Sequence, residues 1–197
     1  MSQNNNYPGP YLTRISHKSP DALIQESVSR TIQAAMQKFD EKLFEGPWTT
    51  GGLGIVSINP RNIAATNQAT GLQGGVAGSG AWGVTAVTAS TWTQWINLSI
   101  DDRIFLVVTG IMTRSPAPNI TAIKPYANGQ DLPQVSIEEM YTFEESKAYF
   151  TEPIIISPGN IFRIDVLSPV TLAGIPSEQI GLMGYTIGKR AYLINTA

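Results

Sequence analysis

The stretch AYFTEPIIISPGNIFRIDVLS, residues 148–168, indicates the fold class of this chain. Within residues 162–166 apolar and polar side chains alternate, which is the period of a strand with one face in the core and one in water. Between the two apolar runs, residues 157–160 place Pro and Gly where a type II turn favours them. Two strands joined by a short turn predict a mainly β protein.

The same two-residue period runs through the chain from Trp48 onward, and turn signals divide it into short segments. Asn128-Gly129 is the strongest of these signals and predicts a type I′ hairpin, while residues 100–103 predict a further turn. The predicted strands are residues 53–59, 84–90, 92–98, 103–113, 120–126, 134–138, 148–157, 161–168 and 180–195, the last being two strands or one long bent one. About eight short strands without intervening helices predict a β-sandwich or a closed barrel.

The segments upstream of the strands differ in character. Residues 1–18 are rich in Asn, Pro and Gly and predict a flexible arm. Residues 19–46 predict an amphipathic helix, begun by Ser19 and Pro20 and followed by Pro47. Its apolar stripe consists of Ile24, Val28, Ile32, Ala35, Met36, Phe39 and Leu43. A strict heptad covers only part of this stripe, so we expect a helix lying on a globular surface rather than a coiled coil, with residues 47–197 as the sandwich domain.

The composition limits the classes of function. Charged residues make up 14% of the chain, against about 25% in a typical soluble domain. A surface with few charges suits packing against neighbouring subunits, because fewer ions must be desolvated at each contact. The net charge of −2 argues against nucleic-acid binding as the main task, since phosphate contacts need a basic face. The chain has no cysteine, which excludes disulfides, thiolate metal sites and cysteine nucleophiles.

Targeting segments are not predicted. The start MSQNNNYPGPY lacks a basic region followed by an apolar run, so we expect no signal peptide. The longest strongly apolar stretch, residues 104–112, is far shorter than the roughly 20 residues that a membrane helix needs. We therefore expect no transmembrane segment.

Two features imitate functional motifs. Residues 78–83 match GxGxxG, but a loop precedes them and a β-branched segment follows, whereas a dinucleotide site needs a strand before and a helix after. We interpret the glycine-rich residues 71–83, which contain this match, as a flexible loop that orders against a neighbour. The single histidine, His17, lies in the arm without the partners that a triad or a metal site requires. The sequence predicts no cofactor and no metal.

Clustered glutamates and tryptophans leave alternatives open. The glutamates are Glu138, Glu139, Glu144, Glu145 and Glu152. A carboxylate pair could hydrolyse glycosides, but adjacent residues of a strand face opposite ways, so we favour a solvated edge and predict no catalytic residue. The tryptophans are Trp48, Trp82, Trp92 and Trp95. Since Trp92 and Trp95 are three apart and face opposite sides of a strand, we favour core or subunit-contact roles over a sugar platform.

The layout of a polar arm, one amphipathic helix and about eight strands resembles the single jelly-roll capsid proteins of tailless icosahedral viruses of archaea and bacteria. Residues 149–166 and 179–194 carry the resemblance. It implies a mainly β fold, a jelly-roll β-sandwich of about eight antiparallel strands with an N-terminal amphipathic α-helix. It also implies that loops and the arm bridge neighbouring subunits, and it brings no catalytic residue.

We therefore predict a viral structural protein, a capsid or vertex subunit that acts by symmetric self-assembly and not as an enzyme. Expected partners are copies of the chain itself and other capsid proteins, without specific nucleic acid. The expected location is the virion, after assembly in the host cytoplasm. The candidate assembly residues are Ile24, Val28, Ile32, Met36, Phe39, Leu43, Trp48 and Trp82.

Two other functions fit the same sequence. One is a carbohydrate- or receptor-binding β-sandwich module of a fibre or tail protein, in which exposed tryptophans contact a glycan. The other is a glycosidase that uses the central glutamates.

Overall fold

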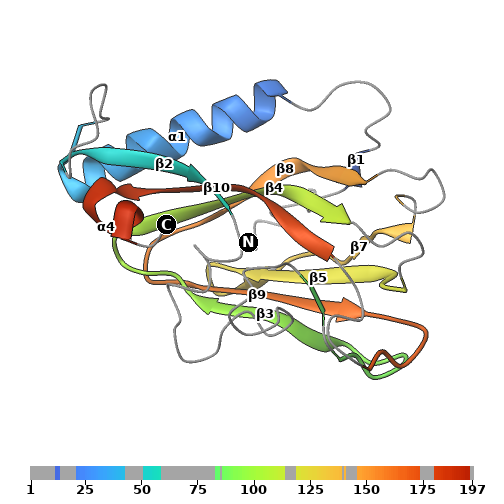
Figure 1. The fold of residues 1–197 in the computed structure, drawn as a ribbon. Helices are drawn as coiled ribbons and strands as arrows, with labels where there is room; N and C mark the ends of the chain where they lie inside the picture. The colour runs from blue at the N-terminus through green and yellow to red at the C-terminus, as the bar shows by residue number, and fades with distance from the viewer. Residues whose placement is uncertain are drawn as a thin grey trace, which may run out of the picture.

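The computed structural model describes residues 12–13, 21–42, 51–58, 83–84, 86–113, 119–138, 140, 146–173 and 180–195. Within these ranges strands predominate, and they form two antiparallel sheets that face each other (Figure 1). One long helix, α1 (Asp21–Phe39), lies on the outer face of the first sheet. The predicted mainly β fold with an N-terminal helix is confirmed.

The two sheets take their strands alternately along much of the chain. The first sheet has the order β1 (Leu12–Thr13), β8 (Lys147–Ile156), β4 (Ile104–Thr113), β10 (Ile180–Lys189) and β2 (Leu53–Ser57). The second has the order β3 (Thr93–Ser99), β9 (Ile161–Leu167), β5 (Ala122–Ala127) and β6 (Gln130–Asp131), with β7 (Val135–Ser136) also pairing with β5. From β2 to β5, and again from β8 to β10, each strand lies in the sheet opposite to its predecessor.

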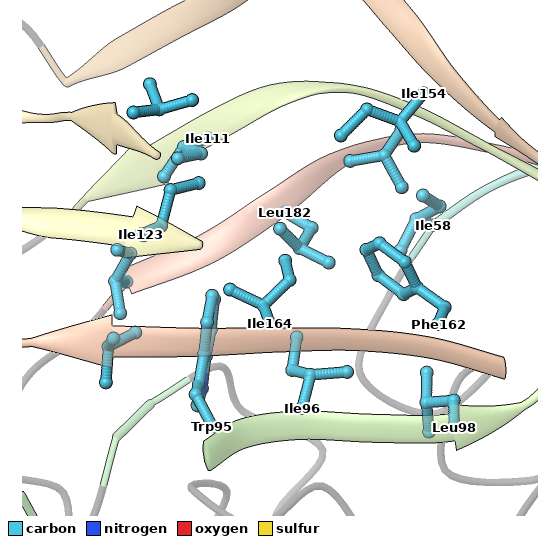
Figure 2. Close-up of a cluster of buried hydrophobic side chains, with 14 of the residues drawn as sticks. Ile58, Trp95, Ile96, Leu98, Ile111, Ile123, Ile154, Phe162, Ile164 and Leu182 are labelled. Carbon is cyan, nitrogen blue, oxygen red and sulfur yellow. The ribbon is translucent and has the colours of Figure 1, made fainter. Parts of the chain in front are cut away.

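The main core fills the space between the sheets. Its largest fully buried side chains include Trp95, Phe150 and Phe162, and Figure 2 shows Trp95 and Phe162 beside the aliphatic residues of both sheets. Strand β9 alternates buried and partly exposed positions after its exposed first residue, as the sequence predicts for a strand with one wet face. Apolar burial of this extent is the main stabilising term of a sandwich.

Strand β4 is apolar along almost its whole length because it has a core on both sides. Ile104, Leu106 and Val108 belong to the core between the sheets. Phe105 and Val107 belong to a second core under α1, which also contains Ala35, Leu53 and Ile187. The helix therefore completes a third layer, and no strict alternation can appear in β4.

The turns follow the predicted chemistry. Asn128 and Gly129 have φ values of 51° and 83°, as a type I′ hairpin between β5 and β6 requires. Gly159 has φ 79° and the amide of Asn160 donates to Ser157 O at 3.2 Å, in agreement with a type II turn. Pro125 in β5 has no backbone N–H that could donate to the neighbouring edge strand. That edge strand is divided into β6 and β7, which both pair with β5.

Gly184 occupies a position in β10 that no other residue fits well. Its φ is 153°, and a Cβ built on it would lie 2.0 Å from Val107 O. The register of β10 against β4 shifts between Met183 and Gly184, which marks a β-bulge. Glycine there lets the two central strands of the first sheet approach each other closely.

Two segments differ from the sequence-based expectation. The predicted strand 180–195 is wrong beyond Lys189, because the chain turns into helix α4 (Arg190–Asn195) and Leu193 enters the main core beside Gly54. Arg190, the first residue of this helix, is only 8% exposed. Predicted strand 84–90 is not a continuous strand, because its described residues hold only isolated bridge positions, at Val84 and at Val87, the latter pairing with Leu172.

The N-terminal segments also differ from the predicted bounds. Helix α1 ends at Phe39, well before residue 46, because Asp40 takes a left-handed conformation with φ 51°. Two residues of the predicted arm form β1 and pair with β8, where Leu12 lies opposite Phe150. Among the described residues, no helix is long and apolar enough to cross a membrane.

Candidate functional site

The apolar stripe of α1 faces its own sheet. Ala35 is fully buried, and Phe39 meets Phe105 of β4 edge to face, with ring centroids 5.8 Å apart and planes at 66°. Thr31, which the apolar pattern does not mark, is also buried, and its hydroxyl donates to Ser27 O at 2.7 Å, which satisfies the polar group there. The helix thus packs on its own domain, a choice that the sequence leaves open.

The predicted assembly residues on α1 differ in exposure. The half-buried ones are Ile24, Val28, Ile32 and Phe39. Met36 is 37% exposed, and Leu23, outside the predicted stripe, is 45% exposed. Leu43, Trp48 and Trp82 lie outside the described residues. The part of the stripe that a neighbouring molecule can still reach is therefore small, and its role in assembly stays a prediction.

The two described tryptophans have opposite environments. Trp95 is 2% exposed, and its indole N–H donates to Gly83 O at 3.0 Å. Trp92 is 36% exposed. The expectation that these two residues face different ways is confirmed, which leaves Trp92 as an aromatic side chain available for contacts.

Other exposed apolar side chains lie on several elements. Ile55 is on β2, Ile161 begins β9, and Val170 follows that strand in the chain. Ile161 is the most exposed of them at 49%. Scattered apolar residues of this kind are common on protein surfaces, and they give small contact sites rather than one continuous patch.

The outer face of the second sheet carries an ion-pair network, here called the charged face: Lys124, Tyr126, Asp131, Arg163 and Asp165. Arg163 lies at its centre. Its Nη2 is 3.4 Å from Oδ1 of Asp131, and its Nε is 3.4 Å from Oδ2 of Asp165. Its guanidinium carbon is 4.9 Å from the centre of the Tyr126 ring. Lys124 reaches Asp131 at 3.5 Å.

The charged face has two positive and two negative side chains, which neutralise each other. The guanidinium of Arg163 lies over the ring of Tyr126, so that ring face is not free to stack on a sugar. The arrangement fits a solvated polar surface better than a binding site for an anion. The sequence marks the wet face of β9, but it does not reveal Asp131 as a partner because β6 is not among the predicted strands.

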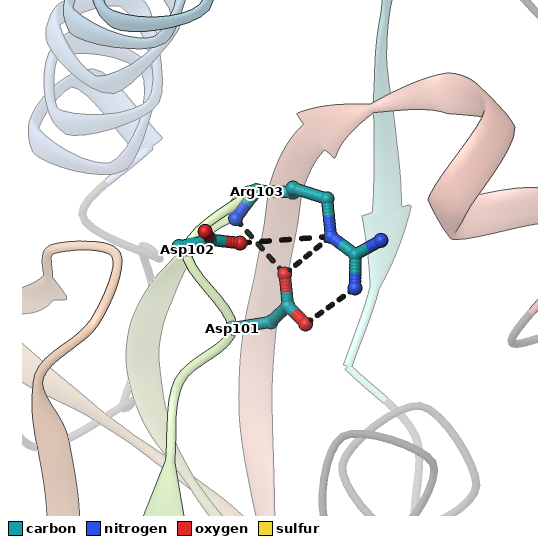
Figure 3. Close-up of polar contacts among 3 residues, drawn as sticks. All are labelled: Asp101, Asp102 and Arg103. Atoms are coloured by element: carbon teal, nitrogen blue, oxygen red, sulfur yellow. Dashed lines mark hydrogen bonds and ion pairs between the residues drawn. The ribbon is translucent and has the colours of Figure 1, made fainter.

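The turn between β3 and β4 is held by a second ionic contact (Figure 3). Asp101 accepts hydrogen bonds from Nε and a terminal nitrogen of Arg103, both at 2.7 Å, and from the Arg103 backbone amide at 3.0 Å. The side-chain hydrogen bonds from Arg103 hold the pKa of Asp101 well below its usual range, although partial burial opposes them. This contact stabilises the passage of the chain from one sheet to the other.

The residues considered for catalysis are not assembled in the described part of the chain. Glu138 and Glu152 are exposed. Glu139, Glu144, Glu145 and His17 lie outside the described residues, as do residues 78–82 of the GxGxxG segment. Among the residues that the structure does describe, no group of three or more His, Cys, Asp or Glu side chains could hold a metal ion.

Comparisons with protein-family models, with curated proteins and with solved structures find no match for this chain.

Proposed function

We propose that the chain is a viral structural protein, a capsid or vertex subunit built on a single jelly roll, which acts by symmetric self-assembly. The observation that carries the proposal is the order of the strands. The exposed surface and the composition add support.

The strand order supports a jelly roll, in which an antiparallel ribbon of eight strands rolls up into two sheets. In such a ribbon the first strand pairs with the eighth, the second with the seventh, the third with the sixth and the fourth with the fifth. Counted from β2, with β6 and β7 as one interrupted strand, these pairs are β2–β10, β3–β9, β4–β8 and β5–β6/β7. All four pairs are antiparallel neighbours. Strand β1 and helix α1 are additions to this ribbon.

The surface supports association through several small contacts. Helix α1 covers its own sheet, so a subunit has a complete core before it meets another. Exposed apolar residues remain on separate elements, among them Met36, Trp92 and Ile161. Contacts of this size are weak singly, and repetition by symmetry makes the assembly stable. The proposed partners are copies of the chain and other capsid proteins, and the proposed location is the virion.

Light scattering coupled to size exclusion, over a series of protein and salt concentrations, tests the proposal. We expect defined oligomers or shells, with negative-stain images of each peak to identify them. Trp92→Ala and Ile161→Asp should reduce assembly without lowering the melting temperature. The control is Ile164→Ala, on the buried face of β9, the strand that Ile161 begins. This variant should lower the stability of the subunit but should still assemble below its melting temperature. A monomer under every condition would contradict the proposal.

A carbohydrate- or receptor-binding module is the second candidate, and exposed Trp92 favours it. Trp92 precedes β3, whose exposed positions include Gln94 and Asn97. An aromatic ring beside amide side chains can stack on a sugar and hydrogen-bond its hydroxyls. Glycan-array binding that Trp92→Ala abolishes, by a protein that stays monomeric, would place this function first.

A further inference from the structure

The side chain of Asn128 joins the two sheets. Asn128 lies in the hairpin turn of the second sheet, but its Nδ2 donates to Ile155 O at 2.7 Å and its Oδ1 accepts from the Ser157 amide at 3.0 Å. Ile155 belongs to β8 of the first sheet, and Ser157 follows that strand directly. The side-chain amide thus pairs with β8 much as a backbone peptide group would, and we call these two bonds the Asn128 clamp.

Asn128 is also followed by Gly129, and this is the only Asn-Gly pair in the chain. Asparagine is a thermolabile residue. In an Asn-Gly pair the glycine nitrogen, after losing its proton, attacks the side-chain carbon Cγ of asparagine. Ammonia leaves and a cyclic succinimide remains. One water molecule then opens the ring to aspartate or isoaspartate, so the net reaction is exchange of an amide for a carboxyl group and ammonia. Glycine presents no side chain that would hinder the attack.

The clamp opposes this reaction in the folded protein. The attack requires Asn128 to rotate so that Cγ meets the Gly129 nitrogen, while the two hydrogen bonds hold the amide atoms against β8. The reactive geometry therefore needs both side-chain hydrogen bonds to break, which is a local opening of the structure.

We propose that Asn128 is a site of spontaneous deamidation that the clamp protects, and that deamidation there records the opening of the clamp. The product cannot restore the clamp. An aspartate has no amide hydrogen for Ile155 O and instead places a carboxylate oxygen against that carbonyl. Each molecule that opens and reacts is thus changed permanently at the contact between the two sheets. The inference holds whether or not the chain assembles into a capsid.

The experiment compares the full chain folded in buffer with the same chain unfolded in guanidinium chloride, at equal pH and temperature. Peptide mapping by mass spectrometry gives the deamidation rate at Asn128 over time. Two hydrogen bonds should slow the reaction about thirty-fold in the folded protein. Equal rates in the two states would overturn the proposal.

A variant that leaves Asn128 and Gly129 unchanged separates the clamp from general rigidity. Ser157→Pro removes the amide that donates to Asn128 Oδ1 and should raise the folded-state rate about fivefold, with no change in the unfolded state. If circular dichroism shows that this variant does not fold, Asn160→Ala takes its place, because Asn160 Nδ2 donates to Ser157 O at 3.3 Å and supports the same turn. Asn97→Ala, at an exposed position of β3, is the matched control and should leave the rate of deamidation at Asn128 unchanged. A folded-state rate that the clamp variant does not raise would also overturn the proposal.

Discussion

The two sheets have the same antiparallel pairing but different surroundings. The first is buried on both faces at its centre, between the main core and helix α1, whereas the second exposes one face with the charged network around Arg163. Strand β4 accordingly has only one residue that is not buried, while β9 alternates. A strand between two cores must be apolar throughout, and a strand with one wet face can keep its charges at little cost.

Because of this difference, we expect residues that determine stability and residues that contact other molecules to lie on different sheets. Substitutions at the centre of the first sheet should act on folding, because both faces are filled. Substitutions on the outer face of the second sheet should act mainly on association, because the side chains there touch solvent.

Gly184→Ala should be the most damaging single change. It adds a Cβ 2.0 Å from Val107 O and forces a non-glycine residue to φ 153°. We expect the free energy of unfolding to fall by about 4 kcal/mol or more, measured by guanidinium denaturation. Gly159→Ala is the matched control, since its φ is 79° but nothing lies within 4 Å of the added Cβ, and it should cost about 1 kcal/mol. Equal losses would show that the close approach of β10 to β4 matters little.

Phe105→Ala should loosen the layer between α1 and the first sheet. It removes the ring that packs against Phe39 and leaves a cavity in the smaller core, at a cost of about 3 kcal/mol. Hydrogen exchange should rise first in the helix. Phe162→Ala, in the main core, should cost a similar amount without selective exchange in the helix. Helix protection that Phe105→Ala leaves unchanged would mean that α1 does not depend on this contact.

The sequence predicts this architecture well where local chemistry decides it. The type I′ and type II turns, the wet face of β9 and the helix with its apolar stripe follow from residues close together in the chain. The order of the strands does not, because periodicity reveals a strand but not its neighbour.

The errors have a common physical cause, which is tertiary contact. Residues 190–195 have the apolar content of a strand, but Leu193 reaches the main core from a helix. The Asn128 clamp is equally hidden, because the Asn-Gly pair predicts a hairpin but not the strand that the side chain meets. For the candidate site, the sequence selects the stripe of α1, and only the packing shows how much of that stripe the chain itself covers.

Asp101→Asn tests a contact at the passage between the two sheets. Because hydrogen bonds from Arg103 make the pKa of Asp101 lower in the folded protein than in the unfolded chain, the ionised form favours folding. That contribution is complete above the unfolded pKa of about 3.9 and fades as the pH falls through the folded value. At neutral pH the variant should lose about 1 kcal/mol, a modest amount because Arg103 is half exposed. Denaturation curves should show that the difference in free energy of unfolding between wild type and variant becomes smaller below about pH 4. A gap that does not change with pH would contradict this assignment.

Arg163 and Ile164 permit the sharpest test, because adjacent residues of one strand point to the two different surroundings. Arg163→Ala removes two ion pairs and a cation–π contact of a side chain that is 34% exposed, and it should cost less than about 1 kcal/mol. Ile164→Ala removes a fully buried side chain and should cost about 3 kcal/mol. Both values come from urea denaturation at low and high salt, and only the effect of Arg163→Ala on the free energy of unfolding should diminish with salt. If Arg163→Ala lowered the free energy of unfolding as much as Ile164→Ala does, the charged face would contribute to folding as the core does. The outer face of the second sheet would then not be free to change for association alone.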